Sequence, residues 1–254
     1  ENDYGLKVKY TVPFLNGPAV SLIYNPTHRR ISDCDNLFRL DRLEGWSISA
    51  NKPLRLLPSI ASMMASCIDL DNTYNYKEVA TDHILTLNIN QRSSTGKGTK
   101  RNVEFAFPIT LTHERLEYTR GLIDTISSRN YTVLNPGLYY ESIWKEERYT
   151  FRASTSFLTS AANFLQLMPF RDDRNPLIVR EGNPNLKQSW IYRTETSLSM
   201  RLRSSSQMLS FSAAANIYGN EIANGFTFNT TTGVCTYRPE NVNGNWELKS
   251  DANY

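Results

Sequence analysis

The sequence has no apolar segment near the roughly 20 residues that a membrane-spanning helix needs. Hydrophobic residues make up 40% of its 254 positions, and its mean hydropathy is -0.46. These values exclude a helical membrane protein. They do not exclude a membrane β-barrel, because each lipid-facing side chain of such a barrel alternates with a polar one.

Cysteine, histidine and the common catalytic motifs are also scarce. The chain has three cysteines and three histidines, and it contains neither an HExxH zinc motif nor a GxSxG nucleophile motif. We therefore predict no catalytic residue, no metal site and no cofactor, and we do not expect an enzyme. Cys34 and Cys67 fall in one irregular region, where a disulfide and free thiols are both open alternatives, and Cys235 lies in a strand-like run.

Three polar segments resemble fragments of functional sites. The Ser/Gly/Lys-rich tip at 94–100 is similar to a phosphate loop, but it lacks the spacing and has strand-like runs on both sides. Asp69 and Asp71 carry only part of a calcium-loop pattern. The two aspartates at 172–173 have arginine neighbours, as in a charged loop. We interpret the 94–100 tip as a mobile hairpin end, the two aspartate segments as solvated, charged loops, and His113 as a lumen-facing polar residue.

Positive and negative charges nearly balance each other, with 28 Lys and Arg residues and 25 Asp and Glu residues. The basic residues are scattered rather than gathered on one segment. Nucleic-acid binding usually needs a concentrated basic surface. The sequence therefore indicates no nucleic-acid partner.

What the sequence does contain is a two-residue alternation, clearest from Trp190 to Leu202. Bulky or apolar side chains occupy nearly all of the even positions there, and polar ones occupy the odd positions from Arg193 to Arg201. Successive side chains of a strand point to opposite faces, so this segment needs one apolar and one polar environment. We predict that the odd residues Arg193, Glu195 and Arg201 face an aqueous lumen and that the even ones face lipid.

The same alternation returns along much of the chain and predicts about ten strands, far above the average strand share of about a quarter. Hairpins are expected around the Asn16-Gly17 turn and around the 94–100 tip, and a short helix around 60–67. A strand is expected from Tyr131 to Trp144. The fold class is therefore all-β, and we predict an antiparallel up-and-down transmembrane β-barrel.

The predicted turns alternate between short and long, as periplasmic turns and extracellular loops do in outer-membrane barrels. The strands are also longer than usual in soluble sheets, and tyrosines and tryptophans fall near their ends, as in aromatic girdles. A soluble, secreted or surface β-sandwich that binds carbohydrate remains the alternative. The short turns are expected at 15–18, 145–148 and 203–207, and the long ones at 25–82, 121–130, 159–188 and 220–229.

Two short motifs then carry a resemblance to a known family. Residues 172–177 read DDRNPL and residues 182–187 read GNPNLK, which is similar to the segment before a barrel strand in TonB-dependent outer-membrane receptors of the Bacteroidetes type. Gln188 and Ser189 replace the Pro-Glu that the family usually has next. Segments at 135–141, 218–222 and 237–244 resemble the same family. The motif residues are Asn175, Pro176, Gly182, Asn183, Pro184, Asn185, Leu186 and Lys187.

The resemblance implies an outer-membrane location in a Gram-negative cell and contact with lipid. Receptors of this family have barrels of about 22 strands, so it implies that residues 1–254 form one interior piece of a larger barrel, without its plug domain. Uptake of a small-molecule, glycan or peptide nutrient would depend on the TonB complex, which contacts parts outside this chain. A surface lipoprotein partner and a signalling role stay open, and a barrel enzyme would need a nucleophile and base that the sequence does not show.

Overall fold

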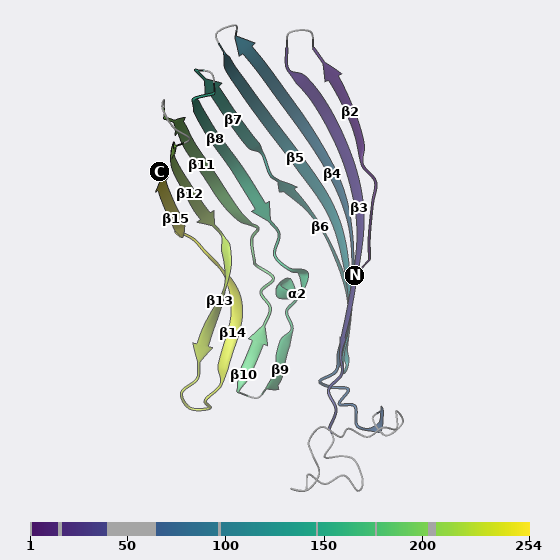
Figure 1. Cartoon of the computed structure of the whole chain (residues 1–254). Helices are drawn as coiled ribbons and strands as arrows, with labels where there is room; N and C mark the ends of the chain where they lie inside the picture. Colours follow the sequence, from purple (N-terminus) through teal and green to yellow (C-terminus); the bar gives the residue numbers. More distant parts are fainter. Residues whose placement is uncertain are drawn as a thin grey trace, which may run out of the picture. The chain divides into compact units, whose positions relative to one another are not determined.

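The computed structural model describes residues 2–14, 17–39, 65–95, 98–145, 147–175, 177–202 and 207–254, and these form almost only β-strands (Figure 1). The chain divides into two compact units. Unit 1 contains Glu1–Tyr4, His28–Thr81 and His113–Asn130, and unit 2 contains Gly5–Thr27, Asp82–Thr112 and Tyr131–Tyr254. Among the described residues, no helix has the length and apolar character needed to cross a membrane.

Unit 2 is built on a sheet in which each strand pairs with the next along the order β2-β3-β4-β5-β7-β8-β11-β12-β15. β3, β4 and β5 continue from this unit into unit 1. The strands are β2 (Val8–Pro13), β3 (Ala19–Asp35), β4 (Tyr74–Thr95), β5 (Thr99–Arg120), β7 (Gly137–Trp144), β8 (Tyr149–Ser160), β11 (Ser189–Arg201), β12 (Met208–Gly219) and β15 (Trp246–Asn253).

The register of these strands places like side chains side by side. Leu198 of β11 lies opposite Phe151 of β8 and Phe211 of β12. Phe211 is 45% exposed, so no second layer of the described residues covers the apolar row at this position. A β-sandwich would bury such residues in a dry interior, and the structure therefore contradicts the sandwich alternative for this sheet.

Short connections gather at one end of this sheet (Figure 1). β7 and β8 are joined there by a tight turn in which the Arg148 amide donates to the Lys145 carbonyl at 3.2 Å. Lys145 and Glu147, in the four-residue connection between Trp144 and Tyr149, have positive φ values of 52° and 66°, which are uncommon for residues other than glycine. Of the short turns predicted at 15–18, 145–148 and 203–207, residues 15–16, 146 and 203–206 lie outside the described residues, and described strands lie on both sides of each predicted turn.

A second, four-stranded sheet belongs to unit 2 and lies at the end opposite these turns (Figure 1). Its order is β13-β14-β10-β9, and β10 pairs with β14 in parallel. The short helix α2 (Phe164–Leu167) precedes it in the chain and begins at Asn163, whose side chain accepts from the Leu165 amide. The strands are β9 (Arg171–Asn175), β10 (Ile178–Glu181), β13 (Glu221–Phe228) and β14 (Cys235–Val242).

Unit 1 contains most of β1 (Asn2–Gly5) and of β6 (Ile123–Leu134), and parts of β3, β4 and β5. β1 pairs with β3, and β6 pairs with β5. Arg120, at the end of β5, donates through Nε to the Asp71 carbonyl and through Nη2 to Asn72 Oδ1, both at 3.1 Å. These bonds attach the 69–72 turn to the β5–β6 hairpin.

Four charged side chains from four neighbouring strands meet in unit 1. Glu114 is 3% exposed, and one of its carboxylate oxygens lies 2.6 Å from Arg129 Nη2 while the other lies 3.8 Å from Arg29. Glu78 also lies 3.8 Å from Arg29. Burial raises the pKa of the Glu78 carboxyl, and the negative charge of Glu114 raises it further, while Arg29 and Arg129 oppose the increase.

The four long loops predicted from the sequence are only partly loops. The 25–82 region contains the end of β3 and the start of β4, and its part at 40–64 lies outside the described residues. The 121–130 region is a two-residue turn followed by β6. The 159–188 region includes α2, β9 and β10, and the 220–229 region is mainly β13. These strands carry polar residues on both faces, so apolar alternation did not reveal them.

Two further expectations are refined. The strand predicted from Tyr131 to Trp144 is broken at Asn135 and Pro136, because proline has no amide hydrogen to give to the ladder. All three cysteines are free thiols, so the alternative of a bridge between Cys34 and Cys67 is wrong in this structure. Of the helix expected at 60–67, residues 60–64 lie outside the described range.

The cluster of Arg29, Glu78, Glu114 and Arg129 predicts opposite changes in stability when each glutamate is replaced by glutamine. Glu114→Gln leaves Arg129 without its carboxylate partner and should lower the local stability of β5 and β6 by about 3 kcal/mol. Glu78→Gln should raise that stability at pH 7, since the raised pKa means that folding disfavours the ionised carboxyl. This gain should vanish as the pH falls through the pKa of Glu78, because the wild-type carboxyl is then protonated too. Hydrogen exchange of β5 and β6 peptides measures both changes. Equal destabilisation by both variants would contradict this account.

Candidate functional site

The polar face of the unit 2 sheet carries a row of ionic side chains across three strands. Arg193 Nε donates to Asn216 Oδ1 at 3.1 Å, and Asn216 Nδ2 donates to Glu247 Oε2 at 3.0 Å. Lys249 Nζ lies 2.7 Å from the other Glu247 oxygen. Since β11, β12 and β15 each contribute one or two of these residues, the network exists only when the three strands are in register.

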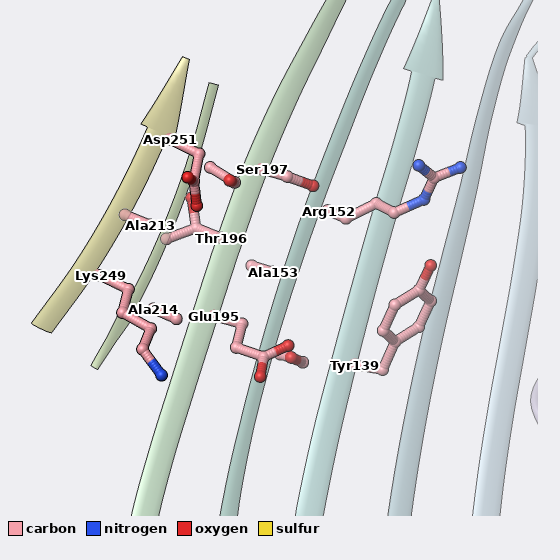
Figure 2. Close-up of a pocket in the computed structure, with 12 residues that line it drawn as sticks. Tyr139, Arg152, Ala153, Glu195, Thr196, Ser197, Ala213, Ala214, Lys249 and Asp251 are labelled. Carbon is pink, nitrogen blue, oxygen red and sulfur yellow. The ribbon is translucent and has the colours of Figure 1, made fainter. Parts of the chain in front are cut away.

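Beside this network lies a shallow cavity of about 340 Å³. Glu195 and Lys249 extend into it from β11 and β15, and Tyr139 and Arg152 from β7 and β8 (Figure 2). Arg152 is held by Glu141, whose Oε1 lies 2.7 Å from its Nε. Glu195 forms no hydrogen bond or ion pair with any residue that the structure describes, so its carboxylate is available to a passing ligand.

The three residues predicted to face a lumen lie on one face of β11. Arg193 lies opposite Asn216, Glu195 opposite Ala214 and Arg201 opposite Met208. Arg193 and Glu195 therefore belong to the polar region just described, and Arg201 lies at the short-turn end of the same face. That this face borders a lumen stays a prediction.

The residues of the GNPNLK motif lie elsewhere, at the junction between the two sheets of unit 2. The Asn183 side chain donates to the Pro239 carbonyl at 2.9 Å and accepts from the Asn185 amide at 3.0 Å. Its own amide donates to the Gln166 carbonyl at 2.6 Å. One asparagine thus connects the α2 segment, the β14 strand and the start of the motif.

Asn241 makes a second connection around this junction. Its Oδ1 accepts from the Lys187 amide at 2.7 Å, and its Nδ2 donates to the carbonyls of Lys187 and Asn220 at 3.1 and 2.7 Å. Leu186 donates its amide to the Asn183 carbonyl at 3.3 Å. The motif therefore fixes where the chain enters β11, and its role in the described structure is positional.

The motif has glycine at position 182 because a larger side chain would not fit there. A Cβ atom at this position would lie 1.8 Å from the Met168 carbonyl oxygen and 3.1 Å from that of Gln166. Its amide donates to the Phe170 carbonyl at 3.1 Å. Asn175 accepts from the Leu177 amide at 3.0 Å in the β9–β10 turn, while Pro176 lies outside the described residues.

The second sheet has two unlike faces, which the sequence analysis did not detect. Val179 on one face is buried, as are Phe164 and Met168 from the α2 segment. The other face carries Phe226 and Phe228, which are 68% and 59% exposed. The strand register on this face places Phe226 beside Tyr237 and Tyr237 beside Arg180. We call Phe226, Phe228, Tyr237 and Arg180 the aromatic face.

The weaker chemical candidates have ordinary partners. Asp69 accepts from Asn72 Nδ2 at 3.0 Å, and His113 is hydrogen bonded to Asn130 at 2.6 Å. Part of the 94–100 tip and the side chain of Asp173 lie outside what the structure describes. No group of three or more His, Cys, Asp or Glu residues suited to a metal ion occurs among the residues searched, which are the described ones.

Comparison with known proteins places residues 112–254 on a family model described as "Outer membrane protein beta-barrel family". No curated protein matches the chain. The chain is similar to a mutant ferric enterobactin receptor from Pseudomonas aeruginosa at 13% identity and TM-score 0.48, over 98% of this chain and 40% of that one. It is also similar to a siderophore receptor from P. aeruginosa at 11% identity and TM-score 0.34, over 98% of this chain and 59% of that one. A siderophore receptor from Acinetobacter baumannii is similar at 10% identity and TM-score 0.43, over 98% of this chain and 41% of that one.

The close approach at Gly182 predicts a selective effect of one methyl group. Gly182→Ala should destabilise the junction by about 1–3 kcal/mol, because the added carbon cannot fit without moving the Met168 backbone. Gly137→Ala is the matched control, since its Cβ would meet nothing closer than 3.7 Å. Hydrogen exchange of peptides from 164–188 would measure the change. A Gly182 variant as protected as the control would refute the steric argument.

Proposed function

Because this chain belongs to the outer membrane protein beta-barrel family, we propose that it forms part of the wall of a TonB-dependent receptor that takes up a nutrient. The protein is an outer-membrane β-barrel segment of a Gram-negative cell. The single observation that carries the proposal is the two-faced sheet of unit 2, with an uncovered apolar face and an ionic face on the same strands.

The apolar face fits the hydrocarbon of a membrane. Its large apolar side chains are partly or fully exposed. Phe151, Leu198 and Phe211 form a row of such side chains across β8, β11 and β12. A soluble protein rarely leaves a contiguous apolar surface of this kind uncovered. Lipid chains provide the missing environment without any further protein layer.

The ionic face then borders the lumen. Arg193, Glu195 and Arg201 would line the path of the ligand, as predicted from the alternation of β11. Fixed charges along such a path select ligands by their charge and hydrogen-bonding groups. Energy for uptake would come from the TonB complex, which acts through parts of the receptor other than those described.

The first contact with the ligand would be made by the second sheet. The end with short turns corresponds to the periplasmic side of outer-membrane barrels, which assigns the second sheet to the extracellular side. Exposed aromatic rings next to an arginine suit a glycan, a peptide or an aromatic small molecule. We propose that the aromatic face makes this first contact with the ligand, which we call its capture role. A surface lipoprotein is a further partner that this face could bind.

The assignment of the two faces predicts different environments for two adjacent residues of β11. With the three native cysteines replaced by serine, a spin label at Met200 should be accessible to oxygen dissolved in lipid and a label at Arg201 to a water-soluble relaxation agent. The protein should be produced from its complete gene and placed in bilayers. Equal water accessibility at both positions would contradict the proposed wall.

The capture role predicts a loss of ligand binding without a loss of folding. Phe226→Ser combined with Phe228→Ser should weaken binding of the nutrient about tenfold or more, because each stacked ring contributes about 1 kcal/mol. Ala223→Ser, on the opposite face of β13, is the control. Thermal-shift screening of glycans, peptides and ferric chelates identifies the ligand, and titration then compares the variants. Unchanged affinity in the double variant would exclude the aromatic face as the capture site.

A further inference from the structure

The sequence contains three Asn-Gly pairs, at 16–17, 224–225 and 243–244. Such a pair is open to deamidation, the spontaneous loss of the asparagine side-chain amide, because glycine places no side chain in the way of the attacking backbone nitrogen. The fold permits this reaction where that nitrogen is free and slows it where the nitrogen or the strand around it is held. The three pairs differ in this respect.

Two of the pairs are held by backbone structure. The Gly17 amide donates to the Phe14 carbonyl at 3.1 Å, so its nitrogen already has a partner. Asn224 and Gly225 lie within β13, where they pair with Pro239 and Arg238 of β14. Side chains of a paired strand stand roughly perpendicular to the sheet, which keeps the Asn224 side chain away from the next backbone amide. We expect both pairs to react slowly.

The third pair, Asn243 and Gly244, lies in the exposed connection between β14 and β15. Gly244 has a φ of 95°, and a Cβ atom there would meet no other atom within 4 Å. Its amide forms no hydrogen bond with any part of the chain that the structure describes. The attacking nitrogen of this pair is therefore free and accessible to water.

The Asn243 side chain is held at one end only. Its Oδ1 accepts from the Asn220 amide at 2.7 Å, while its Nδ2 has no hydrogen-bond partner among the described residues. A donor at Oδ1 stabilises the negative charge that develops on this oxygen when the amide carbon is attacked. The group that must leave, Nδ2, has no bond to break other than the covalent one.

We infer that Asn243 is a site of spontaneous deamidation. The Gly244 nitrogen loses its proton to water and bonds to Asn243 Cγ, and the bond from Cγ to Nδ2 breaks as Nδ2 takes up a proton and leaves as ammonia. Water then adds to either carbonyl of the five-membered succinimide ring and opens it. The products are aspartate or isoaspartate at position 243, and the net reaction consumes one water and releases one ammonia.

The products change a junction within unit 2. The Asn245 carbonyl accepts from the Tyr218 amide at 3.0 Å, and the Asn245 side chain donates to Glu221. These bonds join the start of β15 to the end of β12 and the start of β13. Isoaspartate adds one backbone carbon before Asn245, and both products add a negative charge near Glu221. Deamidation should therefore loosen this junction, whether or not the proposed function is correct.

The test follows the protein, produced from its complete gene and purified in detergent, during incubation in mildly alkaline buffer. Peptide mapping by mass spectrometry measures the conversion of amide to acid at each Asn-Gly pair. Asn243 should react at least about tenfold faster than Asn224, because β13 must first open locally and each tenfold corresponds to about 1.4 kcal/mol of opening. In denaturant the two rates should become equal, since both asparagines precede glycine.

Two variants connect the reaction to the junction. Hydrogen exchange of peptides from 216–222 and 243–249 should become faster as the wild type is incubated. Asn243→Gln should abolish this change, because the longer side chain cannot form the five-membered ring, and Asn224→Gln is the matched control that should retain it. Equal rates at Asn243 and Asn224 in the folded protein would overturn the inference, as would a difference that persists in denaturant. Unchanged exchange in the deamidated wild type would refute the effect on the junction.

Discussion

Backbone hydrogen bonding is the constraint on which the structure depends. In hydrocarbon no water can satisfy an amide or carbonyl, so each strand must be paired along its length by neighbours on both sides. β11 meets this demand, because it pairs with β8 from Ser189 to Met200 and with β12 from Trp190 to Arg201. Pairing in turn fixes which side chains are neighbours, and so it creates both the apolar rows and the network around Glu247.

β4 and β5 extend from the unit 2 sheet into unit 1, where their charged side chains need partners. β4 and β5 have 22 residues each, about twice the 9–11 residues that cross a bilayer. Their additional residues carry charges on both faces, and these charges are compensated differently. Glu114 is buried and needs Arg129, whereas the exposed Arg115 lies beside Glu117 in water and gains little from this pair.

The segments between the long strands are ordered by asparagine and glycine rather than by a large apolar core. Asn183 and Asn241 each bind backbone groups from distant parts of the chain, and Gly182 permits a close backbone approach. These contacts hold the second sheet against the start of β11 and leave the aromatic face exposed. The GNPNLK motif thus positions the surface that is expected to bind the ligand.

The all-β class and the two faces of β11 could be predicted from the amino-acid sequence, because side-chain alternation is a local property. It also placed Arg193 and Glu195 on one face of β11. Strand pairing in the folded chain, by contrast, combines segments of 159–188 and 220–245 into a second sheet and buries Glu114 between two arginines. Each of these depends on register between strands far apart in the chain, and register is set by pairing rather than by any one segment.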